Sequence, residues 1–465
     1  MSASVSQAAG KPRFPRQIKF IVGNEAAERF SFYGMRSILV IFMTQYLIMQ
    51  KSDAKAVYHY FITAAYFFPL LGGYISDRYL GKYRTIITLS LVYCLGHAVL
   101  ALFDGQSGLY TGLFLIALGA GGIKPCVSAH VGDQFDKSNA SLLTKVFAIF
   151  YFSINFGAFF SMALIPKLLT NYGPKVAFAV PGVLMFIATW VFWMGRHYYV
   201  FVPPSGKEHS AQFFGILWHS LTHQGEKKPG QTWLDVSLPK YGAERVDGAK
   251  AVVNIFKVLA SITAFWALFE QHGSSWVLQA QKMDRLFMGI QFEASQIPGL
   301  NPILIMIFVP IFNWLVYPAV EKAGIKVTPL RKIGAGMFMT GTAFIAAAIL
   351  DGVLAAGGKP NIGWQFVQYL LVTFAEIMIS ITGLEFAYTQ APRAMKSTIM
   401  GLFFLTVSIG NLFTGIISSI NPFREGMGEF MFYAGVMFIF SFIFVYMAKR
   451  YDERSYIESG GQVGH

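Results

Sequence analysis

Twelve long apolar runs follow one another along the chain, separated by shorter polar connections. A helix that crosses the hydrocarbon core of a bilayer needs about 20 predominantly apolar residues, so each run predicts one membrane-spanning helix. The pattern therefore predicts an all-α, polytopic membrane protein with 12 transmembrane helices. The predicted spans are residues 18–48, 57–77, 83–103, 107–130, 144–168, 174–196, 251–281, 297–320, 329–352, 363–390, 397–420 and 427–449.

One connection is longer and more polar than the others. It contains turn-like breaks at Gly225–Gly230 and Ser237–Lys240, and its apolar stretch Phe213–Leu221 is too short to span a bilayer. We expect this stretch to lie along the membrane surface. The connection divides the chain into an N-terminal six-helix bundle (1–196), a cytosolic linker (197–250), a C-terminal six-helix bundle (251–450) and a cytosolic tail (451–465).

The composition agrees with a membrane protein. Hydrophobic residues make up 54% of the chain and charged residues only 13%, whereas soluble domains carry about 25% charge. The net charge of +13 comes from loops that alternate along the chain, on the side of the N-terminus. Cytoplasmic loops are the ones rich in Lys and Arg, so both termini are predicted to be cytosolic, in a multi-pass protein of the plasma (inner) membrane. Examples are Lys11, Arg13, Arg16, Lys19, Arg78, Lys82, Arg84, Lys326, Arg331, Lys332, Lys449 and Arg450.

The basic excess thus reflects topology, and nucleic-acid binding is not expected. Cys94 and Cys126 lie in different apolar runs and suggest no disulfide framework. The first twenty residues are basic and polar and lack the features of a cleavable signal peptide.

Four charged residues interrupt the first span. Glu25, Glu28, Arg29 and Arg36 lie where a bilayer core is expected, and each costs a few kcal/mol there unless it is paired or faces water. On a helix, Glu25, Arg29, Tyr33 and Arg36 share one face. A soluble amphipathic helix, or a helix end whose charges reach the headgroups, is the alternative explanation.

Apart from Glu25 and Glu28, the charged residues in the middle of the spans divide by sign between the two halves. Cations lie in the N-terminal half and carboxylates in the C-terminal half, so a cavity between the halves would suit a small zwitterion. The N-terminal half contributes Arg29, Arg36 and Lys124 with Tyr33, His59, Tyr66 and Asn155, and the C-terminal half contributes Glu270, Glu376, Glu385 and Asn301. Burying the whole set for folding alone would be expensive, which favours a binding role.

Two sets of motifs resemble known families. The loop Gly73–Arg84 has the GxxxDRxxGKxR pattern of the major facilitator superfamily, echoed faintly at Glu321–Lys326. Glu25-x-x-Glu28-Arg29-Phe-x-Phe-Tyr33-Gly-Met-Arg36 resembles the ExxERFxYYGxR motif of proton-dependent oligopeptide transporters. Further blocks are Gly121–Pro125, Phe150–Gly157, Phe265–Gln271 and Thr382–Pro392.

The resemblance implies a major facilitator fold of two six-helix bundles around a midplane site. It also implies a proton-coupled symporter of di- and tripeptides that works by alternating access, with no cofactor, metal or obligate protein partner. By resemblance, Arg29, Lys124 and Tyr33 would bind the peptide carboxylate, with Arg36 and Tyr66 close by in the substrate site. Asn155, Asn301 and Glu376 would bind the amino end and backbone. Proton coupling and gating would fall to Glu25, Glu28, Arg29, His59, Lys124 and Glu270, with Glu270 pairing either Lys124 or Arg36 across the halves.

Several departures and alternatives stay open. Phe32 replaces a motif tyrosine, Phe403 stands where many members have Trp, and the linker has no room for the two extra helices of many bacterial members. Nitrate carriers share this fold, so another small anion or zwitterion is the alternative substrate. An enzyme is not expected, because only His219 and His223 show a ligand-like spacing and no acidic partner accompanies them.

Overall fold

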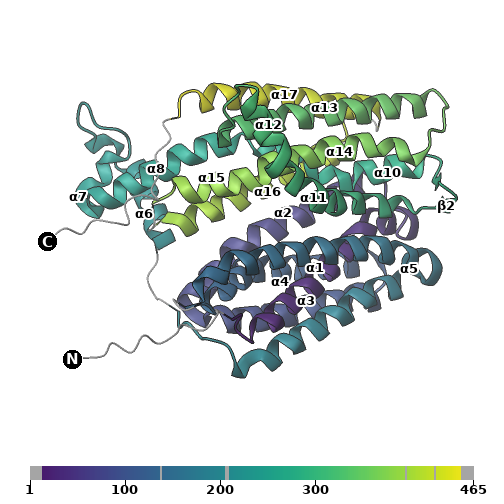
Figure 1. The fold of residues 1–465 in the computed structure, drawn as a ribbon, viewed down its shortest axis with the longest axis horizontal. Coiled ribbons are helices and arrows are strands. Elements are labelled where there is room, and N and C mark those ends of the chain that lie inside the picture. Colours follow the sequence, from purple (N-terminus) through teal and green to yellow (C-terminus); the bar gives the residue numbers. More distant parts are fainter. Residues whose placement is uncertain (1–12, 137–138, 205–208, 393–394, 424–425, 452–465) are drawn as a thin grey trace, which may run out of the picture.

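The computed structural model describes residues 13–136, 139–204, 209–392, 395–423 and 426–451. Nearly all of them are helical (Figure 1). Residues 1–12, which include Lys11, lie outside the described residues, and so do residues 452–465 of the predicted tail. The domain boundaries at 196, 197, 250 and 251 stay predictions.

The N-terminal half is built from long helices and short π or 3-10 turns. Its elements are α1 (Ile18–Ile41), η1 (Phe42–Tyr46), α2 (Lys51–Ile75), η2 (Ser76–Leu80), α3 (Lys82–Leu102), α4 (Gly105–Asp133), η3 (Ala140–Leu142), α5 (Leu143–Met194) and η4 (Gly195–His197). The predicted spans 144–168 and 174–196 both fall on α5, where Gly173 has φ +81 and breaks the helical backbone. Gly173 can adopt this left-handed conformation because it has no Cβ.

The linker and the C-terminal half contain more interrupted helices. The linker comprises α6 (His209–Thr222), η5 (Gln224–Glu226), η6 (Asp235–Ser237) and α7 (Leu238–Tyr241). The C-terminal half comprises α8 (Ala243–Ala260), α9 (Thr263–Phe269), η7 (Glu270–Gly273), α10 (Ser275–Gln281), β1 (Leu286–Phe287), β2 (Ile290–Gln291), η8 (Ala294–Gly299), α11 (Leu300–Ile311), η9 (Phe312–Val316), α12 (Tyr317–Lys322), α13 (Pro329–Ala355), η10 (Ile362–Trp364), α14 (Gln365–Glu376), η11 (Ile377–Ile381), α15 (Thr382–Gln390), α16 (Lys396–Ile420) and α17 (Met427–Ala448).

Each of the twelve predicted spans falls on helical residues. By length and apolar composition alone, eight helices in the described ranges qualify as membrane spans, or nine if the bent unit of α8, α9 and α10 is included. The helices α1 and α2 are not among them. For α1 this follows from its charged residues, which include Glu25, Glu28, Arg29 and Arg36.

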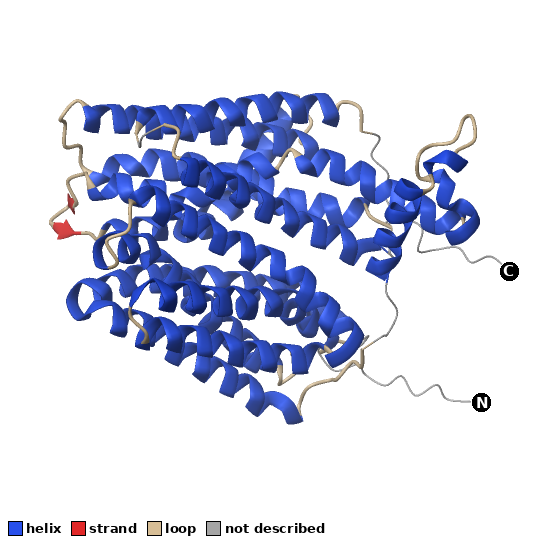
Figure 2. Ribbon diagram, turned by 180° about the vertical axis from the view of Figure 1, so that it is seen from behind, coloured by secondary structure: helices blue, strands red, loops and turns tan. Residues whose placement is uncertain are grey.

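The two halves lie side by side as separate groups of helices (Figures 1 and 2). The linker helices α6 and α7 mark one end of the long axis, here called the linker end. The β1–β2 hairpin, in which Phe287 pairs with Ile290, marks the opposite hairpin end. Between the halves, α2 packs along α16, and α5 packs against η8 and α11.

The contact between the halves is tied by polar bonds. The hydroxyl groups of Tyr60 and Ser419 are 2.8 Å apart, and Ser408 donates a 2.9 Å hydrogen bond to the Thr63 carbonyl. Gln296 donates a 2.7 Å bond to the carbonyl of Ala163. These bonds come from the N-terminal part of α2 and from η8, which follow the connections at the hairpin end, so the halves are joined toward that end.

The apolar stretch Phe213–Leu221 forms most of α6. Phe213 and Ile216 are buried, while Phe214, Trp218 and Leu221 are 52%, 71% and 64% exposed. The exposed residues follow an i, i+4, i+7 spacing on one helix face. The prediction that this stretch lies along a membrane surface stays a prediction.

Candidate functional site

The centre of the candidate site is a guanidinium shared by two carboxylates on α1. Arg29 Nε lies 2.7 Å from Glu25 Oε1 and 2.8 Å from Glu28 Oε2. All three side chains are buried. The Arg29 trio (Glu25, Glu28 and Arg29) holds one acidic group more than its cation can balance. Binding one proton would make it neutral, which suits burial away from water.

Lys124 on α4 lies close to this trio but forms no ion pair with it. Its ammonium lies 4.7 Å from the ring centre of Phe32 and 4.0 Å from that of Tyr66. Among the described residues, Nζ has no hydrogen-bond partner. A buried ammonium held only by aromatic faces keeps its donors available, so it is a ready partner for an incoming anion.

The predicted pairing across the halves uses Arg36. Arg36 Nη2 forms an ion pair with Glu270 of η7, and Arg36 Nε donates a 2.6 Å hydrogen bond to the Tyr58 hydroxyl. Both charged side chains are almost fully buried. Of the two partners expected for Glu270, the structure selects Arg36 and not Lys124.

The local backbone explains how Glu270 reaches Arg36. The span breaks into α9, the 3-10 turn η7 and α10, and Glu270 opens that turn. Gly273 closes the turn, and a Cβ built there would lie only 2.0 Å from the Tyr58 hydroxyl. Glycine therefore allows α2 and η7 to approach closely enough for Tyr58, Arg36 and Glu270 to meet.

His59 lies in the interface between the halves and, in the described part of the chain, forms no hydrogen bond or ion pair with the Arg29 trio. Its Nδ1 is 2.8 Å from Asn411 Oδ1, and its Nε2 is 2.9 Å from the Ser274 hydroxyl. Asn411 donates its amide to the Val407 carbonyl, so its oxygen faces the imidazole ring. This arrangement assigns the proton to Nδ1 and makes Nε2 the acceptor. His59 thus connects α2 with α16 and with Ser274.

The C-terminal half contributes an acid and an amide. Asn301 Nδ2 donates to Glu376 Oε2 at 2.6 Å and to Thr373 Oγ1 at 3.2 Å. Glu376 is the last residue of α14 and precedes the π turn η11. Such turns occur often at functional sites, because they alter the direction of neighbouring side chains. Both Asn301 and Glu376 remain partly exposed.

Tyr33 connects the two sets of charges. It interacts electrostatically with Arg29 and Arg36 of its own helix and with Glu270 and Glu376 of the opposite half. The ring also lies 5.7 Å from the Arg36 guanidinium. The structure therefore brings Arg29, Arg36, Glu270 and Glu376 into one electrostatic neighbourhood, whereas the predicted carboxylate Glu385 is exposed.

Asn155 and Tyr66, which were predicted to bind substrate, contact other side chains or backbone of this chain. Asn155 donates a 3.0 Å hydrogen bond to the Tyr151 carbonyl of its own helix. Tyr66 lies beneath the Lys124 ammonium, and its ring is 6.3 Å from that of Phe404 on α16. Their proposed contacts with a substrate stay predictions.

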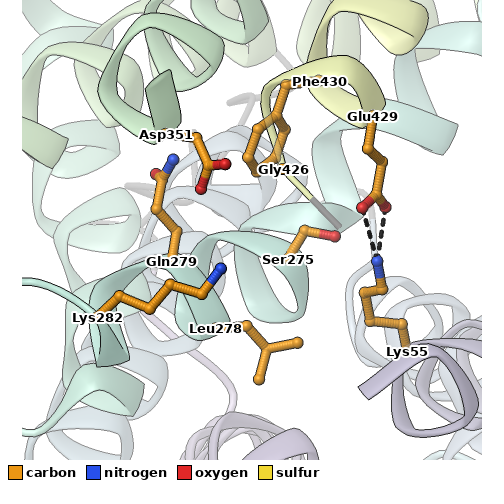
Figure 3. A pocket seen from close by; sticks show the side chains of 9 residues that line it. All are labelled: Lys55, Ser275, Leu278, Gln279, Lys282, Asp351, Gly426, Glu429 and Phe430. Atoms are coloured by element: carbon orange, nitrogen blue, oxygen red, sulfur yellow. Dashed lines mark hydrogen bonds and ion pairs between the residues drawn. The ribbon is translucent and has the colours of Figure 1, made fainter. Parts of the chain in front are cut away.

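The sequence analysis missed a second ion pair between the halves. Lys55 Nζ of α2 lies 2.7 and 2.8 Å from the two carboxylate oxygens of Glu429 on α17 (Figure 3). The pair borders a small pocket that Ser275, Lys282 and Asp351 also line. Lys55 precedes the predicted span 57–77, and Glu429 is the third residue of the predicted span 427–449, so neither was assigned to the middle of a span. Lys55 lies four residues before His59, so both side chains lie on the same helix face. This spacing is the sequence signal from which a buried Lys55 could have been inferred.

The structure also shows how the histidine pair of the linker is arranged. The His219 and His223 rings stack with centroids 4.2 Å apart. No group of three or more His, Cys, Asp or Glu side chains in the described part of the chain is arranged to hold a metal ion.

Comparisons with known proteins agree with one another. The POT family profile matches residues 83–424. Human "Solute carrier family 15 member 2" is 38% identical over 395 residues, which cover 80% of this chain and 54% of that protein. "Peptide transporter family 1" of Drosophila melanogaster is 38% identical over 372 residues, covering 75% of this chain and 49% of that protein. The chain thus spans about half the length of the curated relatives it matches.

A solved structure extends the likeness to the fold. The crystal structure of the POT family transporter PepTSo superposes with a TM-score of 0.89 and 40% identity, covering 94% of this chain and 99% of that one. The predicted all-α major facilitator fold is therefore confirmed.

Proposed function

This chain belongs to the POT family, as its motifs predict, and we propose that it is a proton-coupled symporter of di- and tripeptides that works by alternating access. The observation that carries the proposal is the unpaired ammonium of Lys124 beside the Arg29 trio, with the Asn301–Glu376 pair on the opposite half. This arrangement offers cations for a carboxylate and an acid for an ammonium group. A short peptide carries both groups at its ends.

Recognition of the two peptide ends is divided between the halves. The peptide carboxylate binds Lys124 and Arg29, with Tyr33, Arg36 and Tyr66 nearby. The amino terminus binds Glu376, and Asn301 and Asn155 supply amide groups for the backbone. Charge-assisted hydrogen bonds of this kind are roughly twice as strong as neutral ones, so the ends of the ligand dominate its affinity.

Proton coupling follows from the limited capacity of Arg29. Its Nε already serves Glu25 and Glu28. A peptide carboxylate that binds the same guanidinium draws it away from one glutamate, and that glutamate then becomes a better proton acceptor. Peptide and proton therefore bind together, which is the requirement for symport.

Alternating access uses the bonds between the halves. The pairs Arg36–Glu270 and Lys55–Glu429, with the bonds of His59, close the hairpin end in this structure. With both termini cytosolic, as the basic loops predict, the hairpin end is extracellular, so this is a state closed toward the outside. Breaking these bonds allows the halves to rock and expose the site to the other side.

The alternative substrate is another small anion or zwitterion, such as nitrate. The Glu376–Asn301 pair favours a ligand with an amino group, since nitrate offers nothing for a carboxylate to bind. Glu376 is therefore the residue that distinguishes a peptide from nitrate as the substrate.

Uptake into proteoliposomes tests the proposal. Purified protein is reconstituted, and uptake of a labelled dipeptide is measured with an inward proton gradient, without one, and with an ionophore that collapses it. For one proton per neutral peptide, a 100 mV potential supplies roughly 2.3 kcal/mol, or about fifty-fold accumulation. Accumulation that ignores the gradient would contradict coupling, and gradient-driven uptake of nitrate without peptide uptake would favour the alternative.

A further inference from the structure

A second buried polar region lies inside the N-terminal half, on the far side of the Arg29 trio. It joins one face of α1 to one face of α3. The α1 residues follow an i, i+4, i+7 spacing and the α3 residues an i, i+3, i+7 spacing, so each set lies on a single helix face. This polar seam consists of Asn24, Glu28 and Ser31 of α1 with Ser90, Tyr93 and His97 of α3, and none of these six residues is more than 1% exposed.

Direct contacts hold the two faces together. Ser31 Oγ lies 2.8 Å from His97 Nε2. The rings of Tyr93 and His97 stack with centroids 5.1 Å apart, and Tyr93 interacts electrostatically with Glu28. These contacts join Ser31, Tyr93 and His97, and the Glu28 carboxylate of the Arg29 trio lies within electrostatic range of Tyr93.

Tight packing closes the seam on its other sides. A Cβ built on Gly119 of α4 would lie 2.6 Å from the Cβ of Tyr93, and one built on Gly182 of α5 would lie 2.8 Å from the Cβ of His97. Since α4 and α5 approach this closely, any larger molecule is excluded from these sides.

The seam contains an unusual number of unmet hydrogen bonds. Buried polar groups in proteins are normally paired with protein or with ordered water, and an unpaired one costs about 1–3 kcal/mol. An internal water typically makes about three hydrogen bonds, so a few waters would satisfy the whole set. Within the described residues, the atoms without a well-formed hydrogen bond are Nδ2 and Oδ1 of Asn24, Oε1 of Glu28, Oγ of Ser90, Oη of Tyr93 and Nδ1 of His97. Glu28 Oε2 lies 2.8 Å from Arg29 Nε, and Tyr93 and His97 lie near Ser31 and the Phe178 backbone.

We propose that the polar seam binds ordered internal water and gives Glu28 a route for proton exchange through His97, apart from the peptide site. The proton passes along hydrogen bonds from water to the imidazole, which takes it at one ring nitrogen and releases it from the other, and on to the Glu28 carboxylate. No other bond is made or broken.

The charged residues near the proposed proton route lie at its Glu28 end. Glu28 interacts with Arg29, Glu25 and Lys124. His97 has no charged partner among the described residues, and Cys94 on α3 faces Thr189, at 3.9 Å, and not the seam. The inference rests on the proposed symport, because a proton route has a purpose only in a proton-coupled carrier.

The test separates proton movement from peptide movement. Gradient-driven uptake needs net proton transfer, whereas peptide counterflow exchanges one bound peptide for another without it. The variants are Ser31→Ala, His97→Gln and His97→Phe. Ser37→Ala is the matched control, because Ser37 is also buried on α1 but bonds only the Gly34 carbonyl of its own helix, at 2.8 Å.

We expect Ser31→Ala and His97→Phe to lower gradient-driven uptake about tenfold or more and to shift its pH profile, with counterflow within about twofold of wild type. A high-resolution map should show water in the seam. If His97→Phe fails to fold, Ser31→Ala and His97→Gln decide. Gradient-driven uptake equal to that of Ser37→Ala, or a seam without water, would overturn the proposal. Absence of coupling in the wild type would instead refute the proposed symport.

Discussion

Replacing Glu429 by glutamine removes one partner of the buried ion pair between α2 and α17 and keeps the shape of the side chain. The Lys55 and Glu429 side chains are only 3% and 9% exposed. The two hydrogen bonds between them, 2.7 and 2.8 Å long, are among the contacts that close the hairpin end. The substitution therefore leaves the Lys55 ammonium buried without its counterion.

Breaking a buried pair in this way costs about 3–5 kcal/mol. The cost falls on the closed state, because opening the hairpin end returns Lys55 to water. Since 1.4 kcal/mol corresponds to a factor of ten in an equilibrium constant, the opening equilibrium should shift by roughly two to three and a half powers of ten. A state that was rarely open at the hairpin end becomes substantially populated.

Accessibility of a reporter cysteine measures this shift. Ser275 lines the pocket beside the pair and is 6% exposed. Ser275→Cys is placed in a background in which Cys94 and Cys126 are replaced by alanine, and its reaction with a membrane-impermeant maleimide is timed. Glu429→Gln should speed labelling about tenfold or more, as the open state gains population.

Two further variants make the result decisive. In Lys55→Met with Glu429→Met, apolar side chains replace both charges, and such exchanges are often neutral or stabilising. This double variant should label as slowly as the parent. Lys250→Met, which removes a linker cation 2.5 Å from Asp235, is the control for a lost ion pair elsewhere. If Glu429→Gln labels at the parent rate, or the double variant opens as far as the single one, the ion pair is not a latch.

Three other predictions follow from the structure. Gly273→Ala should lower uptake more than tenfold in correctly inserted protein, because its Cβ would lie 2.0 Å from the Tyr58 hydroxyl; wild-type rates would show that η7 and α2 need not meet. Glu376→Gln should raise the KM for free dipeptides about ten- to a hundredfold, the cost of a charged hydrogen bond, but leave N-acetylated dipeptides unaffected, and equal effects on both would remove Glu376 from amino-end binding. In the linker, hydrogen bonds from Lys250 and Thr232 lower the pKa of Asp235 to about 2. A carboxyl group with a depressed pKa contributes stability that is complete above its unfolded pKa of 3.8 and is lost only as the pH falls through about 2. Lys250→Met should therefore leave the pH profile of uptake unchanged between about pH 5 and 8.

Much of the fold could be predicted, because the bilayer demands long apolar helices whose rough limits are visible in the chain. The charges of α1 were also visible, since four ionised side chains in one apolar run require a partner or water. Helix periodicity placed Glu25 and Arg29 on one face, and they do form an ion pair. Contacts between different helices could not be predicted in this way.

Pairing across the halves depends on tertiary register, which hydrophobic periodicity does not specify. The sequence left Lys124 and Arg36 as equal candidates for Glu270. The structure selects Arg36, because the 3-10 turn and Gly273 bring η7 to Tyr58. Lys55 and Glu429 were overlooked because charges near span ends usually reach the headgroups, whereas here they are buried against each other.

The polar seam shows a different limit. Serine, tyrosine and histidine on an apolar helix carry no strong periodic signal, and only the folded structure reveals that Ser31 of α1 meets His97 of α3. The proton path was left open among Glu25, Glu28 and His59. The structure supports Glu28 as the residue with its own polar surroundings, since His59 bonds Asn411 and Ser274 at the interface.

The central claim is that a peptide carboxylate competes with a glutamate for Arg29, so that peptide binding draws a proton onto the protein. Titration calorimetry of a dipeptide in buffers of different ionisation enthalpy measures that proton directly. The account predicts net proton uptake on binding near neutral pH for the wild type, and a loss of that uptake in either Glu25→Gln or Glu28→Gln, with Ser37→Ala unchanged. Binding of the dipeptide to the wild type with no proton exchanged at any pH between about 5 and 8 would contradict it.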